Sequence, residues 1–135
     1  MKRCSQITIL AFMAFLSGCF AFSAYDKKID GPYRLVAIDT MDQMSVSYDL
    51  GEGGCVGRIA ATVFAVGWSK DFIVAKRHPA NNRAITEYYY LTRSFDSRYA
   101  GPSDSVTGPL SEADFNAKKK VLGLPEFMME IRSLK

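Results

Sequence analysis

Alternating apolar and polar residues in the first half of the chain predict antiparallel strands. Residues 33–40 are rich in strand formers, and residues 45–50 alternate strictly, with Val46, Tyr48 and Leu50 expected to face inward. The polar residues 41–44 separate the two runs, so we expect a hairpin.

A glycine-rich stretch, residues 51–58, follows this hairpin. Glycines of this kind can cradle phosphates, but the stretch lacks the Gly-Lys-Ser/Thr ending of a phosphate-binding loop, and no helix is predicted after it. We therefore interpret it as a flexible loop or bulge ahead of the next strand.

The most apolar stretch, residues 62–79, predicts the central hairpin of the sheet. Two strands flank a polar turn near residues 69–71, and Pro79 ends the second strand because proline cannot donate to the ladder. Both faces of residues 63–66 and 72–74 are apolar, which is typical of strands covered on both sides.

Residues 84–95 predict one more strand, with two different faces. One face carries Ile85, Tyr89 and Leu91, and the opposite face carries Thr86, Tyr88, Tyr90 and Thr92. The following segment, residues 94–108, is polar, and we expect it to form a mobile loop.

The C-terminal segment carries the clearest helix signals. Ser111 is the expected N-cap, Asp114 its partner at the third helical position, and Gly123 the C-cap, while lysines 118–120 fall in the last turn. Pro125 then suits the start of a second short helix, residues 125–134, with an apolar stripe formed by Phe127, Met128, Ile131 and Leu134. The sequence thus predicts an α+β fold: a single small domain with a mostly antiparallel sheet of about five strands, packed by one or two C-terminal helices.

The N-terminus has the organisation of an export signal. Lys2 and Arg3 precede an apolar run, residues 7–16, that is shorter than the about 20 residues a spanning helix needs. We therefore expect the segment to be removed. An ordinary signal peptide cut near Ser23 and an uncleaved anchor are the alternatives.

Residues 16–19, Leu-Ser-Gly-Cys, end this run and resemble the lipobox of bacterial lipoproteins. The resemblance implies cleavage between Gly18 and Cys19, a palmitate-type diacylglyceryl thioether on Cys19, and acylation of the new amino group. Two or three acyl chains give stable membrane attachment. The implied organisation is a signal peptide in residues 1–18, a lipid-anchored tether in residues 19–31, and a single domain in residues 32–135.

The resemblance also implies a location, in the cell membrane or the outer membrane, facing the periplasm or the surface. Residue 20 is Phe rather than Asp. By resemblance to Gram-negative sorting, this favours the outer membrane if the host has one.

Several stretches together resemble a family of small bacterial lipoproteins of unknown function. They are residues 57–59, 62–68, 73–79, 87–89 and 108–116, within a similarity that spans roughly residues 30–125. The resemblance supports the architecture and the location, and it carries no catalytic motif.

The net charge and the number of cysteines limit which ligands and reactions the sequence supports. Loss of Lys2 and Arg3 with the signal lowers the formal net charge from +3 to +1, which gives no electrostatic footprint for nucleic acid. Cys4 leaves with the signal and Cys19 is committed to lipid, so Cys55 is the one remaining thiol. We interpret Cys55 as a small buried hydrophobe, with an intermolecular disulfide or a reactive thiol as alternatives.

The sequence offers no constellation for catalysis. A hydrolase needs a nucleophile and a base, and a metalloenzyme needs several ligands at suitable spacing. The chain has one histidine, His78, which we interpret as a surface or edge residue at a strand end. We therefore expect a protein that is not an enzyme and has no metal site and no cofactor, with a small enzyme as the remote alternative.

The favoured function is a non-catalytic protein-binding module on the cell envelope, of the inhibitor, immunity, exclusion or accessory-subunit type. Aromatic and arginine side chains dominate protein contacts, so the candidate binding residues are Trp68, Arg77, His78, Tyr88 and Tyr90. Ordinary packing of a two-sided sheet is the alternative reading of these residues. The alternative function is a structural or envelope-maintenance lipoprotein without a tight single partner.

Overall fold

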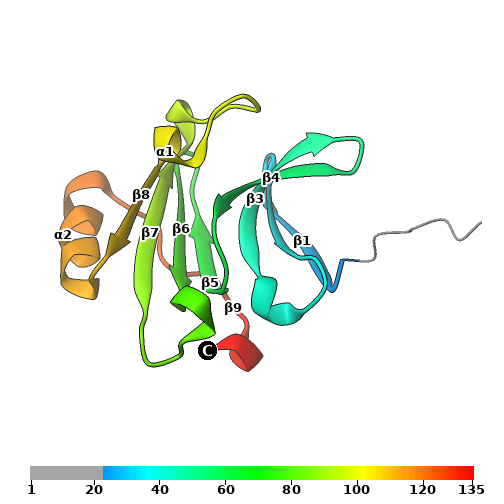
Figure 1. Cartoon of the computed structure of the whole chain (residues 1–135). Coiled ribbons are helices and arrows are strands. Elements are labelled where there is room, and N and C mark those ends of the chain that lie inside the picture. The colour runs from blue at the N-terminus through cyan, green and yellow to red at the C-terminus, as the bar shows by residue number, and fades with distance from the viewer. Residues whose placement is uncertain (1–22) are drawn as a thin grey trace, which may run out of the picture.

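The first sheet is built from the N-terminal half of the domain. The computed structural model describes residues 23–135. The N-terminal half of this range forms four antiparallel strands in the order β1-β2-β3-β4 (Figure 1). The strands are β1 (Tyr25–Asp30), β2 (Tyr33–Ala37), β3 (Ser45–Gly51) and β4 (Gly54–Ile59), with a 3-10 turn η1 (Met41–Gln43) between β2 and β3.

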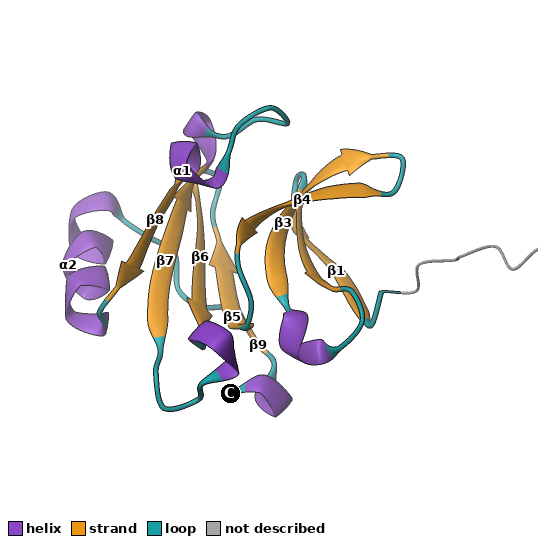
Figure 2. Cartoon of the chain, in the orientation of Figure 1, coloured by secondary structure: helices purple, strands orange, loops and turns teal. Residues whose placement is uncertain are grey.

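The second sheet has five antiparallel strands in the order β8-β7-β6-β5-β9. They are β5 (Val63–Trp68), β6 (Phe72–Arg77), β7 (Glu87–Thr92), β8 (Val106–Leu110) and the two-residue β9 (Met129–Glu130). The 3-10 turns η2 (Pro79–Asn81) and η3 (Arg93–Phe95) flank β7, and η4 (Arg132–Leu134) ends the chain. Figure 2 shows the longest helix beside the second sheet and the short helical turns near the ends of the strands.

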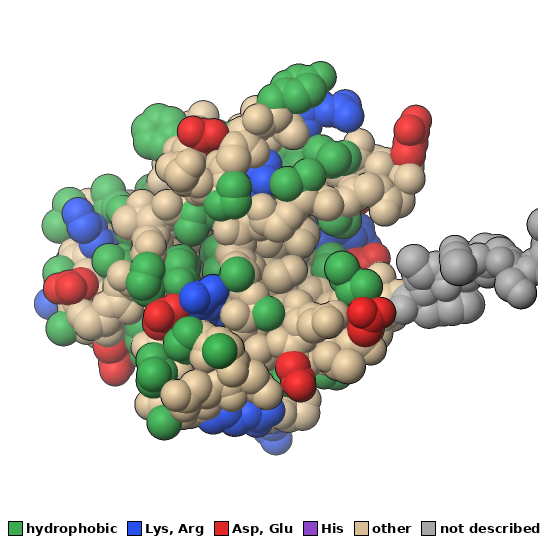
Figure 3. Space-filling view, viewed as in Figure 1, with side chains coloured by type: hydrophobic (Ala, Val, Ile, Leu, Met, Phe, Trp, Pro, Cys, Tyr) green, Lys and Arg blue, Asp and Glu red, His purple; other side chains and the backbone are tan. Residues whose placement is uncertain are grey.

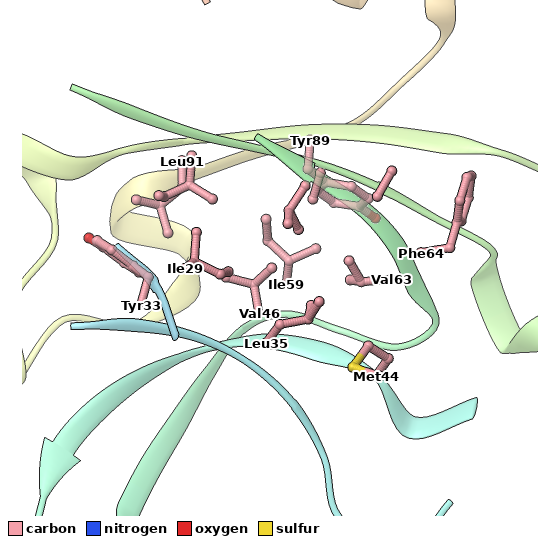
Figure 4. Packing of buried hydrophobic residues seen from close by; sticks show 14 of the residues in the cluster. Ile29, Tyr33, Leu35, Met44, Val46, Ile59, Val63, Phe64, Tyr89 and Leu91 are labelled. Atoms are coloured by element: carbon pink, nitrogen blue, oxygen red, sulfur yellow. The ribbon is translucent and has the colours of Figure 1, made fainter. Parts of the chain in front are cut away.

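The main core lies between the two sheets. Leu35 and Val46 of the first sheet and Val63 and Leu91 of the second are almost fully buried, with Met44 closing one end (Figure 4). Burying one aliphatic side chain of this size contributes about 1.5–3 kcal/mol. The two sheets therefore stabilise each other through this shared layer.

A second, smaller cluster lies on the outer face of the second sheet, under helix α2 (Glu112–Leu122) (Figure 1). The Phe115 ring of α2 is 1% exposed and lies 5.2 Å from the Tyr88 ring and 5.6 Å from the Phe127 ring. The helix thus covers one part of this face, and the second sheet is apolar on both sides.

The structure confirms the predicted fold class. The domain is α+β with antiparallel sheets, although the strands form two sheets instead of one. Ser111 caps α2 by accepting a hydrogen bond from the Asp114 amide at 3.1 Å, and Gly123 ends the helix in the left-handed conformation at φ 68°. Tyr89 and Leu91 face the main core while Tyr88 and Tyr90 face outward, as the alternation predicted.

Three predicted segments differ from the structure. Residues 125–134 form β9 and η4 instead of a second helix, because this segment pairs with the edge of β5. Residues 51–58 form a turn and strand β4 instead of only a loop, since β3 supplies a pairing partner. Residues 94–108 contain η3, the short helix α1 (Pro102–Ser105) and the start of β8, instead of a mobile loop throughout.

The boundary of the domain also differs from the prediction. Part of the predicted tether, residues 19–31, is strand β1, which pairs with β2, and the Ala24 amide donates to the Ile38 carbonyl at 2.8 Å. The folded domain therefore begins before residue 32. Gly18 and Cys19 lie outside the described residues. No helix in the described part of the chain is long and apolar enough to cross a membrane.

Candidate functional site

A groove opens beside the C-terminal end of α2, on the part of the outer sheet face that the helix leaves uncovered. Its cavity volume is about 500 Å³, within the range of small-molecule pockets. Strands β6, β7 and β8, the turn η3, helix α1 and Leu122 of α2 all contribute to its lining.

Aromatic rings form the walls of this groove. The Phe72 and Tyr90 rings lie 6.2 Å apart at 79°, so that they make a corner. Phe95 is 67% exposed and lines the same groove from η3. Figure 3 shows hydrophobic side chains exposed at the end of the molecule where α1 lies. An exposed aromatic side chain next to a groove is typical of a contact surface.

The polar side of the groove comes from α1. Asp104 lines the groove, and its Oδ2 accepts a hydrogen bond from the Gly101 amide at 2.7 Å. Ser105 also lines the groove and is 4% exposed, and within the described part of the chain its hydroxyl has no hydrogen-bond partner. A buried hydroxyl without a partner costs free energy, which a hydrogen bond to a water or ligand atom would offset.

Of the five candidate binding residues predicted from the sequence, Tyr90 lines this groove. Tyr88 lies on the same face and, like Tyr90, is 8% exposed, but it packs under α2 against Phe115 and does not line the groove. Partial burial, and then the charge of Glu112, raises the pKa of Tyr88. Trp68, at the end of β5, is half-buried against the main core.

Arg77 and His78 lie apart from this groove. The Arg77 guanidinium donates to Glu87 Oε2 at 2.8 Å, covers the Tyr89 ring, and lines a smaller hollow of about 250 Å³. The expectation that His78 is a surface or edge residue is wrong. His78 is 3% exposed, its ring stacks on Phe64 at 4.3 Å, and its Nδ1 lies 2.8 Å from the Ile85 carbonyl oxygen.

The expectation that Cys55 is buried is also wrong. Cys55 is exposed on β4, opposite Asp49 of β3. Partial loss of contact with water is the main reason that the pKa of the Cys55 thiol is raised, followed by the negative charges of Asp49 and Asp26. A raised pKa keeps the thiol protonated near neutral pH, which disfavours a nucleophilic role.

Across residues 23–135, no group of three or more His, Cys, Asp or Glu side chains is placed to hold a metal ion.

Sequence reasoning missed most of the groove. The sequence pattern places Phe72 in a strand that is apolar on both faces, and it places Phe95, Asp104 and Ser105 in a polar loop. One signal was present: Phe95 is a large apolar residue inside an otherwise polar stretch. Such a residue has no local partner, so it must pack elsewhere or serve a contact.

The fold and the groove define a small, two-sheet α+β domain with one capped helix and an aromatic-walled cleft beside it. The chain belongs to the DUF3997 family, described as a protein of unknown function, whose profile matches residues 30–131. This agrees with the expected membership of a small family of unknown function. Neither the search of curated proteins nor the search of solved structures gave a match.

Proposed function

We propose that this protein is a lipid-anchored envelope protein whose folded domain is a non-catalytic binding module for another envelope protein. The aromatic groove carries the proposal. The groove is lined by the Phe72 and Tyr90 rings and by Phe95, which is 67% exposed. Buried aromatic side chains in pockets supply much of the binding energy between proteins, so this groove is a suitable anchor pocket.

The anchor is proposed from the sequence pattern in residues 16–19. The described domain begins at Ser23, four residues after Cys19, so an acylated Cys19 would hold the domain within a short distance of the membrane surface. Extended chain covers about 3.3–3.6 Å per residue. A module held this close to the bilayer is suited to a partner in or on the same membrane.

The binding role is tested by purifying partners from detergent-solubilised membranes. We expect the wild-type chain to retain a stoichiometric partner, which the Phe95→Ser variant loses. Ile85→Ser is the matched control, because Ile85 is also an exposed apolar residue, 46% exposed, but does not line the groove. Equal recovery with both variants, or no partner with the wild type, would contradict the binding role and favour a maintenance function.

The anchor is tested separately with Cys19→Ser. We expect this variant to lose labelling by a palmitate analogue, to keep an unprocessed N-terminus and to leave the membrane fraction. If processing, labelling and fractionation are unchanged, the lipobox interpretation is wrong. The groove does not depend on this result, since all its residues lie in the folded domain.

A further inference from the structure

We propose that the groove beside α2 binds a small organic cation: a quaternary ammonium group that carries a hydroxyl, as in choline. This goes beyond the proposed function, because the cation site shares the groove but needs neither membrane attachment nor a protein partner.

The first observation is that the aromatic faces of the groove are free of the chain's own cations. Six other rings in the described part of the chain lie under a Lys or Arg side chain, at 4.6 to 5.5 Å. No such contact there involves Phe72, Tyr90 or Phe95. The rings that line the groove are therefore among those that an external cation can contact without displacing a Lys or Arg side chain.

The geometry of these rings suits a bulky cation. Phe72 and Tyr90 meet nearly at right angles, and Phe95 adds a third, more exposed ring. Aromatic rings around one site recognise quaternary ammonium groups, because the negative face of a ring attracts the positive charge.

The charge of the groove favours the same ligand. Asp104 is the one charged side chain among the residues that line it, and the hydrogen bond from the Gly101 amide holds its carboxylate in place. A cation is attracted to this carboxylate, while an anionic ligand is repelled. A quaternary ammonium is also weakly hydrated, so it loses little when it leaves water for aromatic walls.

The buried hydroxyl of Ser105 indicates the second part of the ligand. Its oxygen has no hydrogen-bond partner among the described residues 23–135, and the residue lines the groove. A ligand hydroxyl within reach would satisfy it. The combination of an aromatic corner, one carboxylate and one unpaired hydroxyl thus points to an ammonium alcohol.

The experiment is calorimetric titration of the full-length chain in a maltoside detergent. Choline is compared with its uncharged isostere 3,3-dimethylbutan-1-ol and with tetramethylammonium. We expect the isostere to bind about tenfold more weakly than choline, because it lacks the charge. No choline binding, or equal affinities for choline and the isostere, would overturn the proposal.

Substitutions of the groove residues test which side chains contact the ligand. We expect Phe95→Leu and Asp104→Asn each to weaken choline binding by at least about fivefold. Tyr99→Leu is the control, since Tyr99 is an aromatic residue four positions after Phe95, is 89% exposed and does not line the groove. Ser105→Ala should weaken choline but not tetramethylammonium. An unchanged affinity in Phe95→Leu, or an equal loss in Tyr99→Leu, would overturn the proposal.

The ammonium group can come from a lipid headgroup or from a free cation. A titration with glycerophosphocholine, the soluble headgroup of phosphatidylcholine, distinguishes these two sources. Affinity equal to that of choline assigns a lipid headgroup, and affinity for choline alone assigns a free cation. Both results support the cation site. The partner purification with Phe95→Ser requires no cation, so either proposal can fail while the other stands.

Discussion

Arg58 and Asp96 form a fully buried ion pair that joins the two sheets. The Arg58 Nε lies 2.9 Å from Asp96 Oδ1, and both side chains are 0% exposed. Arg58 comes from β4 of the first sheet, and Asp96 follows η3 after β7 of the second. Arg58 also donates to the Ser97 carbonyl and covers the Tyr48 ring. The ion pair therefore attaches η3, the turn that contains Phe95, to the first sheet.

Tyr33 completes this network from β2. Its hydroxyl donates to Asp96 Oδ2 at 3.0 Å. Burial is the main reason that the pKa of Tyr33 is raised, followed by the hydrogen bond to Asp96 and its charge. Asp96 thus accepts from two side chains of the first sheet, so removing either donor leaves a buried carboxylate less well paired.

Arg58→Met tests the network. We expect the free energy of unfolding to fall by about 3–5 kcal/mol, because the substitution leaves the Asp96 charge buried without its cation. Arg34→Met is the matched control. Arg34 pairs with Asp26 on the surface, with side chains 26% and 43% exposed, so we expect a loss of about 1 kcal/mol or less. Urea unfolding measures both, and similar losses in the two variants would contradict the buried-pair interpretation.

A second prediction concerns the contact between β5 and the C-terminal segment. The Met128 amide donates to the Val66 carbonyl and the Ile131 amide to the Phe64 carbonyl. A Cβ on Gly67 would overlap the Glu126 carbonyl. We expect Gly67→Ala to push this segment off β5 and cost about 1–3 kcal/mol, with faster hydrogen exchange at the Met128 and Ile131 amides.

Gly57→Ala is the control for this substitution. Gly57 is also a strand glycine, but an added Cβ would meet nothing within 4 Å. We expect its unfolding midpoint to stay near that of the wild type. If Gly67→Ala behaves like Gly57→Ala, the close approach of the two backbones is not required for stability.

A third prediction concerns the helix cap that the sequence indicated. Ser111→Ala removes the acceptor for the Asp114 amide, and we expect a loss of about 1 kcal/mol in thermal or urea unfolding. Ser111→Asp should retain most of the stability, because a carboxylate can accept the same hydrogen bond. Equal losses in both variants would show that the side-chain cap is not the source of the effect.

The features that could be predicted from the sequence are those with local physical signals. Ser111 and Gly123 mark the ends of α2 by themselves, since capping depends on residues within one turn. The strand β7 could be assigned face by face, because alternation places Tyr88 and Tyr90 opposite Tyr89 and Leu91.

The features that could not be predicted depend on distant partners. Residues 125–134 have helical spacing, but a short helix is marginal on its own, and the free edge of β5 pairs with this segment instead. Strand β4 is glycine-rich, and its pairing with β3 outweighs its low strand propensity. Strand β8 begins in the polar stretch that we expected to be a mobile loop, and it contains Pro109, which is tolerated there because β8 is an edge strand paired with β7.

The groove belongs to the same class of features. Phe72, Tyr90, Phe95, Ser105 and Leu122 come from five separate elements, and no pattern within any one of them marks a shared cavity. Tyr90 was a candidate because it is aromatic, and Tyr88 was a candidate for the same reason. The position of α2 decides that Tyr88 is covered and Tyr90 is left beside an open groove.

A fourth prediction concerns stability at alkaline pH. Tyr89 is 7% exposed, and its hydroxyl donates to Glu87 Oε2 at 2.9 Å. Burial first, and the hydrogen bond second, raise the pKa of Tyr89 to about 12. The ordinary value is about 10. The folded protein therefore keeps this proton at pH values where the unfolded chain releases it. The higher pKa in the folded state stabilises the protein. This contribution to the free energy of unfolding is fully present below about pH 10 and is lost as the pH rises towards about 12.

Tyr89→Phe removes the ionisable group while keeping the ring. We expect the free energy of unfolding of this variant to fall less steeply between pH 9.5 and 11.5 than that of the wild type, by an amount of up to about 2 kcal/mol. Urea unfolding at a series of pH values measures the two slopes. Tyr99→Phe, at an 89% exposed ring, should keep the wild-type slope. If Tyr89→Phe also keeps it, Tyr89 does not hold its proton in the folded state, and Tyr33 and Tyr88, whose pKa values are raised as well, become the groups to replace next.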